Sequence, residues 1–135
     1  MDRKDVVIAV VVRAGKVLIC QRKAEDPFGG YWEFPGGKRE QGETAEQCLA
    51  REMMEELALK VDAVEALPPI EHDYPNLRVR LLSYLCTAEG EPKPIACQKL
   101  AWVEPLTLGD YRFPEANAPL LKLIIERLSG GVSVQ

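Results

Sequence analysis

Three glutamates, Glu52, Glu55 and Glu56, are the residues of this chain whose types and spacing point most directly to chemistry. They lie in a segment, residues 43–57, that contains no Gly or Pro and is rich in good helix formers, which predicts an α-helix. At about 100° per residue, the three carboxylates fall within an arc of roughly 100°, beside the apolar stripe that the helix buries. We therefore expect three acids to share one edge of this helix.

This arrangement is unfavourable in a bare helix. Like charges three and four residues apart repel by about 0.2–0.5 kcal/mol per pair, and acids near a helix C-terminus oppose the helix dipole. A solvated acidic face, in which Arg51 pairs with Glu55, is the ordinary interpretation of such a pattern. The other interpretation is a divalent cation that binds the acids and relieves their repulsion.

The segment Gly36-Gly37-Lys38, upstream of the helix, favours the second interpretation. Two glycines allow the backbone to turn sharply and to expose its carbonyls and amides, and Lys38 adds a cation. A loop carbonyl beside a carboxylate triplet forms a cage of hard oxygen ligands, which selects Mg²⁺ or Mn²⁺. Because Mg²⁺ commonly bridges carboxylates to substrate phosphates, these residues point to a site for a phosphorylated substrate.

The elements that must position these residues can be predicted from apolar runs and turn residues. We expect strands at residues 6–12, 17–20, 31–34, 61–66, 77–87 and 100–103, the first two forming an antiparallel hairpin around a turn at 13–16, with a polar loop at 21–30. Glu43 or Thr44 caps the first helix. A second helix starts at Pro114 or Ala118 and ends at Leu128. Two helices among these strands predict an α/β fold, a sandwich with helices on opposite faces of a mixed sheet.

Composition and charge argue against several classes of protein. The 135 residues are 47% apolar and carry a net charge of −4 at pH 7, which describes one globular domain, residues 1–135, with no basic excess to bind a nucleic-acid polymer. The first apolar run is too short for a signal sequence or a membrane span, so we expect no membrane partner. Four cysteines without a C-x-x-C pair predict neither a zinc site nor a disulfide framework. We therefore expect a reduced, cytoplasmic protein, either a monomer or a homodimer.

A set of fixed positions in this chain resembles the signature of the Nudix hydrolase family, G-x5-E-x7-R-E-U-x-E-E-x-G-U, in which U is a bulky aliphatic residue. The matching residues are Gly37, Glu43, Arg51, Glu52, Met53, Glu55, Glu56 and Leu59. Ala58 stands where the pattern has Gly, and we expect a less favourable helix C-cap there rather than lost chemistry. The resemblance implies a Nudix α/β/α sandwich over the whole chain and metal-dependent hydrolysis of a nucleoside diphosphate linked to another group.

Within the family the chain is similar to the MutT branch, in residues 21–22, 33–38 and 113–117. The resemblance implies that Glu52, Glu55, Glu56 and the Gly36 carbonyl bind Mg²⁺ or Mn²⁺, and that Arg51 and Glu43 orient these ligands. It also implies that Arg22 and Lys38 contact phosphates and that Asn117 reads an oxidised guanine, because its amide offers both a donor and an acceptor. Phe34 is expected to line the base pocket or to pack in the core.

The implied reaction is attack by metal-activated water on the β-phosphorus of a nucleoside triphosphate, releasing the monophosphate and pyrophosphate. In MutT-type enzymes a further acid on a loop before the last strand takes part, whereas Ala96 or its neighbour stands at that place here. The general base is therefore open among Glu52, Glu89, Glu91 and Glu104, and we favour Glu52.

The favoured substrate is 8-oxo-dGTP or a related oxidised purine nucleotide, so the expected role is sanitation of the nucleotide pool. The alternatives are a pyrophosphohydrolase for CTP or modified pyrimidine triphosphates, an enzyme acting broadly on several nucleotides, and a non-catalytic Nudix-like module that binds a nucleotide or a protein. Asn117 favours the purine, because an acidic side chain would better accept from the amine of cytosine. Asn117 is also a suitable helix N-cap, and His72 is expected to be a surface or hydrogen-bonded residue rather than a ligand.

Overall fold

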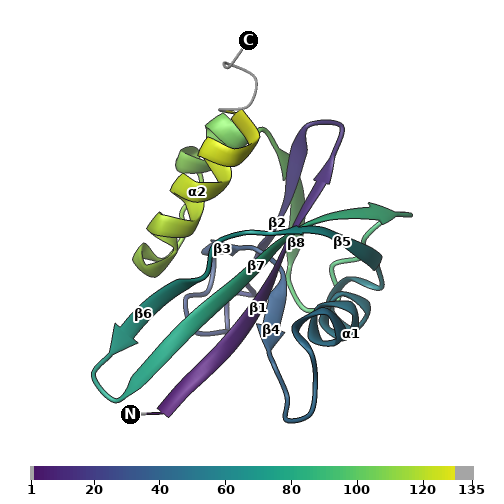
Figure 1. Ribbon diagram of the computed structural model, residues 1–135. Helices are drawn as coiled ribbons and strands as arrows, with labels where there is room; N and C mark the ends of the chain where they lie inside the picture. Colours follow the sequence, from purple (N-terminus) through teal and green to yellow (C-terminus); the bar gives the residue numbers. More distant parts are fainter. Residues whose placement is uncertain (1, 130–135) are drawn as a thin grey trace.

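The apolar run near the N-terminus forms the central strand of the sheet in the computed structural model, which describes residues 2–129 (Figure 1). Strand β1 (Asp2–Arg13) pairs in parallel with β7 (Leu77–Glu89) and forms an antiparallel hairpin with β2 (Lys16–Gln21). Residues 7–11 are all buried, because both faces of this strand are covered. The predicted hairpin and the predicted central strand are therefore both present.

Shorter strands complete a mixed sheet. They are β3 (Trp32–Glu33), β4 (Gly36–Lys38), β5 (Lys60–Ala66), β6 (Ile70–Tyr74) and β8 (Lys99–Val103). The strand order is β3-β2-β1-β7-β5, with β4 paired to β1, β6 to β7 and β8 to β2. The β1–β7 pair is parallel and the other pairs are antiparallel, so the sheet is mixed, as expected.

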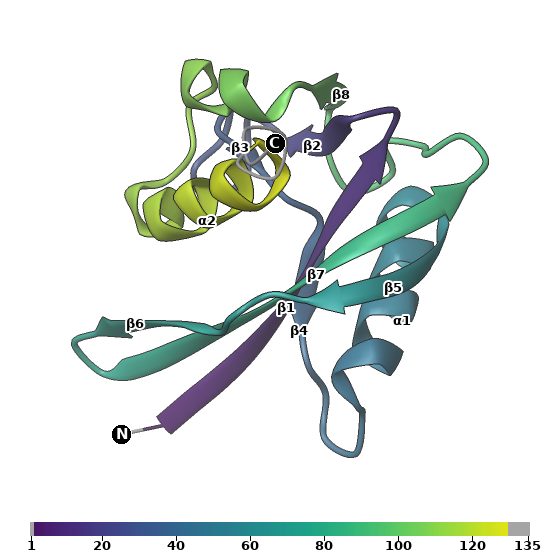
Figure 2. The ribbon, with the colours of Figure 1, turned by 45° about the horizontal axis from the view of Figure 1, so that its top comes forward.

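The two α-helices, α1 (Ala45–Leu57) and α2 (Ala118–Ser129), lie on opposite faces of the sheet (Figures 1 and 2). Because successive side chains of a strand point to opposite faces, β1 contributes to two cores. Val7 packs in the core beneath α1, and Ile8 packs in the core beneath α2. This arrangement is the α/β/α sandwich that the sequence predicts.

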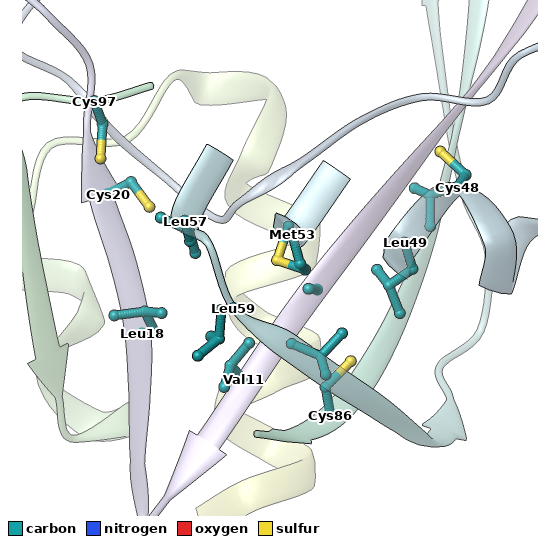
Figure 3. Close-up of a cluster of buried hydrophobic side chains, with 13 residues drawn as sticks. Val11, Leu18, Cys20, Cys48, Leu49, Met53, Leu57, Leu59, Cys86 and Cys97 are labelled. Atoms are coloured by element: carbon teal, nitrogen blue, oxygen red, sulfur yellow. The ribbon is translucent and has the colours of Figure 1, made fainter. Parts of the chain in front are cut away.

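The core beneath α1 fixes the position of the acidic helix (Figure 3). Leu49, Met53 and Leu57 of α1 are almost completely buried, and they pack with Val11 and Leu18 of the hairpin. The four cysteines are buried and free, as expected for small apolar side chains. Burial of a Leu or Met side chain stabilises a fold by about 1.5–3 kcal/mol, so this face of α1 is held firmly.

Two strands and two short helices were not predicted. The segment Gly36–Lys38 was expected to be a turn but forms β4, and β6 was missed because its residues Glu71, His72 and Asp73 show no apolar alternation. The 3₁₀-helices η1 (Pro105–Asp110) and η2 (Glu115–Asn117) precede α2, which begins at Ala118, one of the two predicted starts. Within the described residues, no helix is both long and apolar enough to cross a membrane.

The ends of α1 are set by local hydrogen bonds. Thr44 is the N-cap: its side chain accepts from the Gln47 backbone N–H, and the Gln47 side chain accepts from the Thr44 backbone N–H, which completes a capping box. Ala58 is the C-cap in the left-handed region, with φ of 51°, and its N–H points to the carbonyls of Met53 and Met54. A non-glycine residue in this conformation is the unfavourable C-cap that was expected.

We predict that Thr44→Ala lowers the free energy of unfolding by about 1 kcal/mol, because the first turn of α1 loses its side-chain acceptor. Urea denaturation followed by circular dichroism measures the change. Thr44→Ser, which keeps the hydroxyl, is the matched control and should stay close to the wild type. Equal destabilisation by both substitutions would contradict a role for the capping box.

Candidate active site

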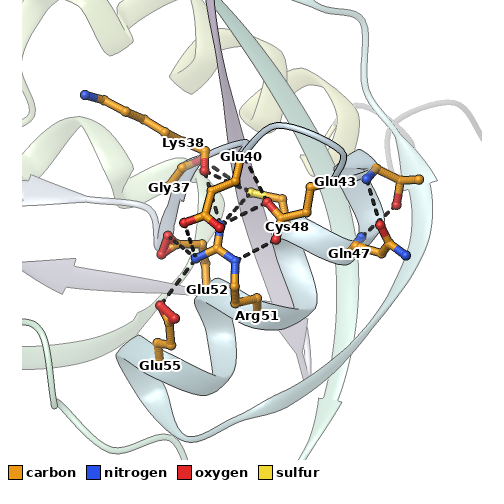
Figure 4. Close-up of polar contacts among 10 residues, drawn as sticks. Gly37, Lys38, Glu40, Glu43, Gln47, Cys48, Arg51, Glu52 and Glu55 are labelled. Carbon is orange, nitrogen blue, oxygen red and sulfur yellow. Dashed lines mark hydrogen bonds and ion pairs between the residues drawn. The ribbon is translucent and has the colours of Figure 1, made fainter.

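The backbone of β4 lies directly against the acidic edge of α1 (Figure 4). The Gly36 N–H donates to Glu56 Oε1 at 3.4 Å, and a Cβ atom at Gly37 would lie 2.0 Å from Glu52 Oε2. A Cβ atom at Gly36 would lie 2.1 Å from the Val7 carbonyl oxygen of β1. Any side chain at either position would therefore push strand, helix or carboxylate apart.

This contact corrects one step of the sequence interpretation. Gly36 and Gly37 were expected to make a sharp turn, but they form an extended strand paired to β1, and neither has positive φ. The glycines are required for close approach rather than for turning. The expected contact between this backbone and the carboxylates of α1 is nevertheless present, with β4 in place of a turn.

Arg51 organises the outer side of the same edge (Figure 4). Its Nε donates to Glu43 Oε2 at 2.6 Å and its Nη2 to Glu43 Oε1 at 3.0 Å, which is a bidentate pair. The same guanidinium donates to the Lys38 carbonyl at 3.3 Å and to Glu55 Oε1 at 3.3 Å, and lies 3.5 Å from Glu52 Oε2. The Arg51 hydrogen bond lowers the pKa of Glu43 to about 2, so this pair remains charged in the physiological range.

Glu52 and Glu56 form the inner side of the edge. Burial raises the pKa of Glu56 to about 7, and the nearby charge of Glu52 adds to the shift. Burial also raises the pKa of Glu52, whose side chain is only 14% exposed. The charge of Glu52 disfavours ionisation of Glu56, and a bound cation would relieve that repulsion.

The oxygen donors at this edge suit a small divalent cation. Glu52 and Glu56 face the β4 backbone, and no side chain of β4 stands between them and the strand. Glu55 is 58% exposed and paired with Arg51, and no group of three or more His, Cys, Asp or Glu side chains within residues 2–129 is already gathered as a metal site. Carboxylate and carbonyl oxygens are the donors that Mg²⁺ and Mn²⁺ prefer.

A cavity of about 790 Å³ lies on the α2 side of β7. Its walls come from the loop after β2, from β6 and β7, and from the segment before α2, and its lining residues are Phe28, Tyr31, His72, Tyr74, Val79, Leu81, Arg112, Phe113, Pro114, Glu115, Ala116 and Asn117. Most of this lining is aromatic or aliphatic, with a few polar groups, which suits a flat heteroaromatic ligand.

Two residues expected at a base pocket take different positions. Asn117 lines the cavity at the end of η2, directly before α2. Phe34 is buried and stacks on Phe113, with ring centroids 5.2 Å apart, so it supports the cavity wall but does not line it. His72, which was expected to be a surface or hydrogen-bonded residue rather than a ligand, lines the cavity and forms an edge-to-face pair with Tyr74.

The two residues expected to contact phosphates, Arg22 and Lys38, have different surroundings. Arg22 donates to Glu33 Oε1 at 2.8 Å and to the Pro27 carbonyl at 2.7 Å, which ties the loop after β2 to β3. Lys38 lines a second hollow, of about 630 Å³, together with Lys4. The adjacent ammonium group of Lys4 lowers the pKa of Lys38.

The loop before β8, in which Ala96 stands where an additional acid was expected, lies beside the end of α1. The backbone N–H groups of Ile95 and Ala96 both point to the Glu56 carbonyl, at 3.2 Å each. Glu91, one of the alternative bases, lies 3.7 Å from Arg13. The loop therefore supports the backbone of the acidic helix without adding a carboxylate at Ala96.

Comparison with known proteins agrees with this fold. The model of the NUDIX domain matches residues 6–123. A Haemophilus influenzae protein named 8-oxo-dGTP diphosphatase is 34% identical over 93% of this chain and 95% of its own length. An Escherichia coli protein named CTP pyrophosphohydrolase is 32% identical over 90% of this chain and 91% of its own length. The solution structure of the E. coli ORF135 protein has a TM-score of 0.87 at 29% identity, covering 100% of this chain and 96% of that one.

These matches extend over nearly the whole chain. The chain belongs to the NUDIX family and is a Nudix hydrolase.

We predict opposite effects of Glu56→Gln with and without metal. The pKa of Glu56 in the fold, about 7, lies above its ordinary value of 4.5, so its contribution to stability is full below pH 4.5 and is lost as the pH rises through 7. In EDTA at pH 8, the variant should therefore unfold at a higher temperature than the wild type. Addition of Mg²⁺ should raise the unfolding temperature of the wild type more than that of the variant.

Thermal unfolding followed by circular dichroism at pH 5.5 and pH 8 measures both effects. Glu46→Gln, which removes an exposed acid from the first turn of α1, is the matched control. A pH-independent difference between the wild type and Glu56→Gln, or equal stabilisation by Mg²⁺, would contradict the assigned position of Glu56.

Proposed function

We propose that this enzyme is a divalent-metal-dependent pyrophosphohydrolase that converts a nucleoside triphosphate to its monophosphate and pyrophosphate. Its favoured substrate in this proposal is 8-oxo-dGTP or a related oxidised purine nucleotide, which it removes from the nucleotide pool. One observation carries the proposal: the acidic edge against Gly37 occurs in the same domain as an aromatic cavity that contains Asn117. The acidic edge suits phosphates with a metal, and the cavity suits a base.

The metal ligands in this proposal are carboxylates of α1 and one backbone carbonyl. Glu52, Glu56 and Glu55 would hold Mg²⁺ or Mn²⁺ together with the Gly36 carbonyl. When bound, the ion supplies an activated water and neutralises charge on the phosphates. The raised pKa values of Glu52 and Glu56 support this assignment, because burial disfavours their charged forms, and a bound cation offsets that cost.

Arg51 and Glu43 are positioning residues in this proposal. Their bidentate pair holds the guanidinium in one orientation, from which it also reaches Glu52, Glu55 and the Lys38 carbonyl. Carboxylates that bind a small octahedral ion need fixed rotamers, and hydrogen bonds from neighbouring groups provide this.

Glu52 is the group that accepts the proton of the attacking water in this proposal. Its side chain is largely buried beside the β4 backbone, and its pKa lies above the ordinary value, which makes it a better proton acceptor than an exposed glutamate. The pairing of Glu91 with Arg13 leaves Glu52 as the better placed candidate of these two. Lys38 and Arg22 complete the proposed site as phosphate contacts.

The cavity supports a purine as the base. The Asn117 amide can donate and accept at once, which matches the O6 carbonyl and the N7–H group of an oxidised guanine. The relatives named for 8-oxo-dGTP and for CTP have nearly equal identity to this chain, so overall similarity does not distinguish the two bases. The relative named for CTP makes a pyrimidine triphosphate the second candidate substrate.

The proposal also places the enzyme in the cytoplasm, as a monomer or a homodimer. The four buried, free thiols are compatible with a reducing compartment.

We predict that Glu52→Gln keeps the fold and lowers kcat by two orders of magnitude or more, the usual scale for loss of a positioned base or ligand. Pyrophosphate release from 8-oxo-dGTP with Mg²⁺ measures the rate, and circular dichroism verifies the fold. Glu46→Gln should retain the wild-type rate. Near-normal turnover of Glu52→Gln would remove Glu52 from the mechanism.

We also predict the order of substrates. In a panel of nucleoside triphosphates with Mg²⁺, kcat/KM should be highest for 8-oxo-dGTP and lower for dGTP, CTP and dCTP, because only the oxidised guanine presents N7–H beside O6 to Asn117. Pyrophosphate release is the measurement. A higher kcat/KM for CTP or dCTP than for 8-oxo-dGTP would overturn the purine assignment.

A further inference from the structure

Arg112 is an exposed cation at the wall of the aromatic cavity, and the proposed function above does not use it. It lies between η1 and η2 and lines the cavity together with Asn117. Its guanidinium carbon lies 4.2 Å from the centroid of the Tyr31 ring, which is a cation–π contact. Glu115, which is also exposed, and His72 are other polar groups of this wall, and most of the remaining lining is apolar.

The backbone around Arg112 is held on both sides. Its carbonyl accepts a hydrogen bond from the Trp32 N–H at 2.8 Å. The preceding Tyr111 packs edge-on against Trp32 at 5.3 Å, and the following Phe113 stacks on Phe34 at 5.2 Å. The position of Arg112 is therefore fixed by the core and not only by its own side chain.

The donors of Arg112 have no acceptor in the described chain. Within residues 2–129, every other arginine has a carboxylate or a carbonyl partner, and these are Arg3, Arg13, Arg22, Arg39, Arg51, Arg78, Arg80 and Arg127. Arg112 alone in that range has only the face of Tyr31. A guanidinium that stacks on a ring keeps its N–H groups at its edge, where they can donate to a ligand.

The chemistry of a guanidinium makes it a selective reader of a base. Asn117 can present either its oxygen or its NH₂ group, so by itself it accommodates both a carbonyl and an amine. Arg112 has donors and no acceptor, so it bonds to a carbonyl oxygen and is not satisfied by an exocyclic amine. At position 6, guanine carries a carbonyl and adenine carries an amine.

We propose that Arg112 is a specificity-determining residue, which donates to a carbonyl oxygen of the bound base and favours purines with a 6-carbonyl over purines with a 6-amine. This inference rests on the proposed function, because it assumes that the cavity holds the base of the substrate. It adds a residue that the family signature does not contain and that the sequence did not indicate.

The test is equilibrium binding of two nucleoside monophosphates, 8-oxo-dGMP and 8-oxo-dAMP, measured by isothermal titration calorimetry with Mg²⁺. Neither monophosphate has an anhydride bond, so neither is hydrolysed during the measurement. These ligands share the sugar, the phosphate and the 8-oxo group, and they differ at positions 2 and 6 of the base. Arg112→Ala should weaken binding of 8-oxo-dGMP by about tenfold or more, and should change binding of 8-oxo-dAMP by much less. Arg112→Glu, which replaces donors by acceptors, should invert the preference.

Two further variants serve as controls. Arg112→Lys keeps a donor and should retain part of the preference for 8-oxo-dGMP. Arg78→Ala removes the same charge from a neighbouring exposed arginine that is paired with Asp73 and does not line the cavity, and it should leave both affinities unchanged. Circular dichroism establishes that each variant is folded.

The outcomes separate this inference from the proposed function. Equal weakening of both ligands by Arg112→Ala would make Arg112 a phosphate contact and overturn the inference, as would an unchanged preference in Arg112→Glu. Absence of Mg²⁺-dependent hydrolysis in the wild type, with the predicted shift in binding preference present, would overturn the proposed reaction and support the inference. Binding of neither product by the wild type would overturn the role of Arg112 together with that of the cavity.

Discussion

The close approach of the β4 backbone to the carboxylates of α1 is the constraint on which the rest of the structure depends. Glu52 keeps its present position because residue 37 has no side chain, and β4 can lie on β1 only because residue 36 has none. Both partners in this contact are fixed independently, β4 by its pairing with β1 and α1 by its buried stripe. The carboxylates are consequently desolvated, which raises their pKa values.

The two faces of the sheet carry different chemistry. The α1 side carries the charges, with Arg51 and Glu43 arranged around Glu52 and Glu55, while the α2 side carries the aromatic cavity. Strand β1 belongs to both, because its alternate residues enter the two cores. A single rigid strand therefore connects the place that suits a metal with the place that suits a base.

Much of the fold could be predicted because its long elements have regular apolar patterns. The strand at residues 6–12, the hairpin, and the helix that ends at Leu57 all follow from runs or periodicity, and the capping residue Thr44 was one of two candidates. Strand β6 could not be predicted, because it is polar and is held by pairing with β7, a contact that no local pattern encodes.

The acidic edge could be predicted from the sequence, but the cavity could not. The glutamates lie within one helix turn or so of each other, so helical geometry places them together. Tyr31, His72 and the pair Arg112 and Asn117 come from three separate segments, and only the folded sheet brings them to one wall. Phe34 shows the same limit, since its aromatic character was recognised, but its position behind Phe113 depends on packing.

The placement of cavity and carboxylates on opposite faces has a consequence for any nucleotide that uses both. At the level of Gly37, β4 pairs only with β1 within the described residues, so the route between the two faces passes around this strand. A ligand that reaches both faces therefore has the width of this strand between its base and the carboxylates. In such a ligand, the distance from the nucleoside determines which phosphoanhydride bond lies at the carboxylates. The length of the phosphate chain beyond that bond does not.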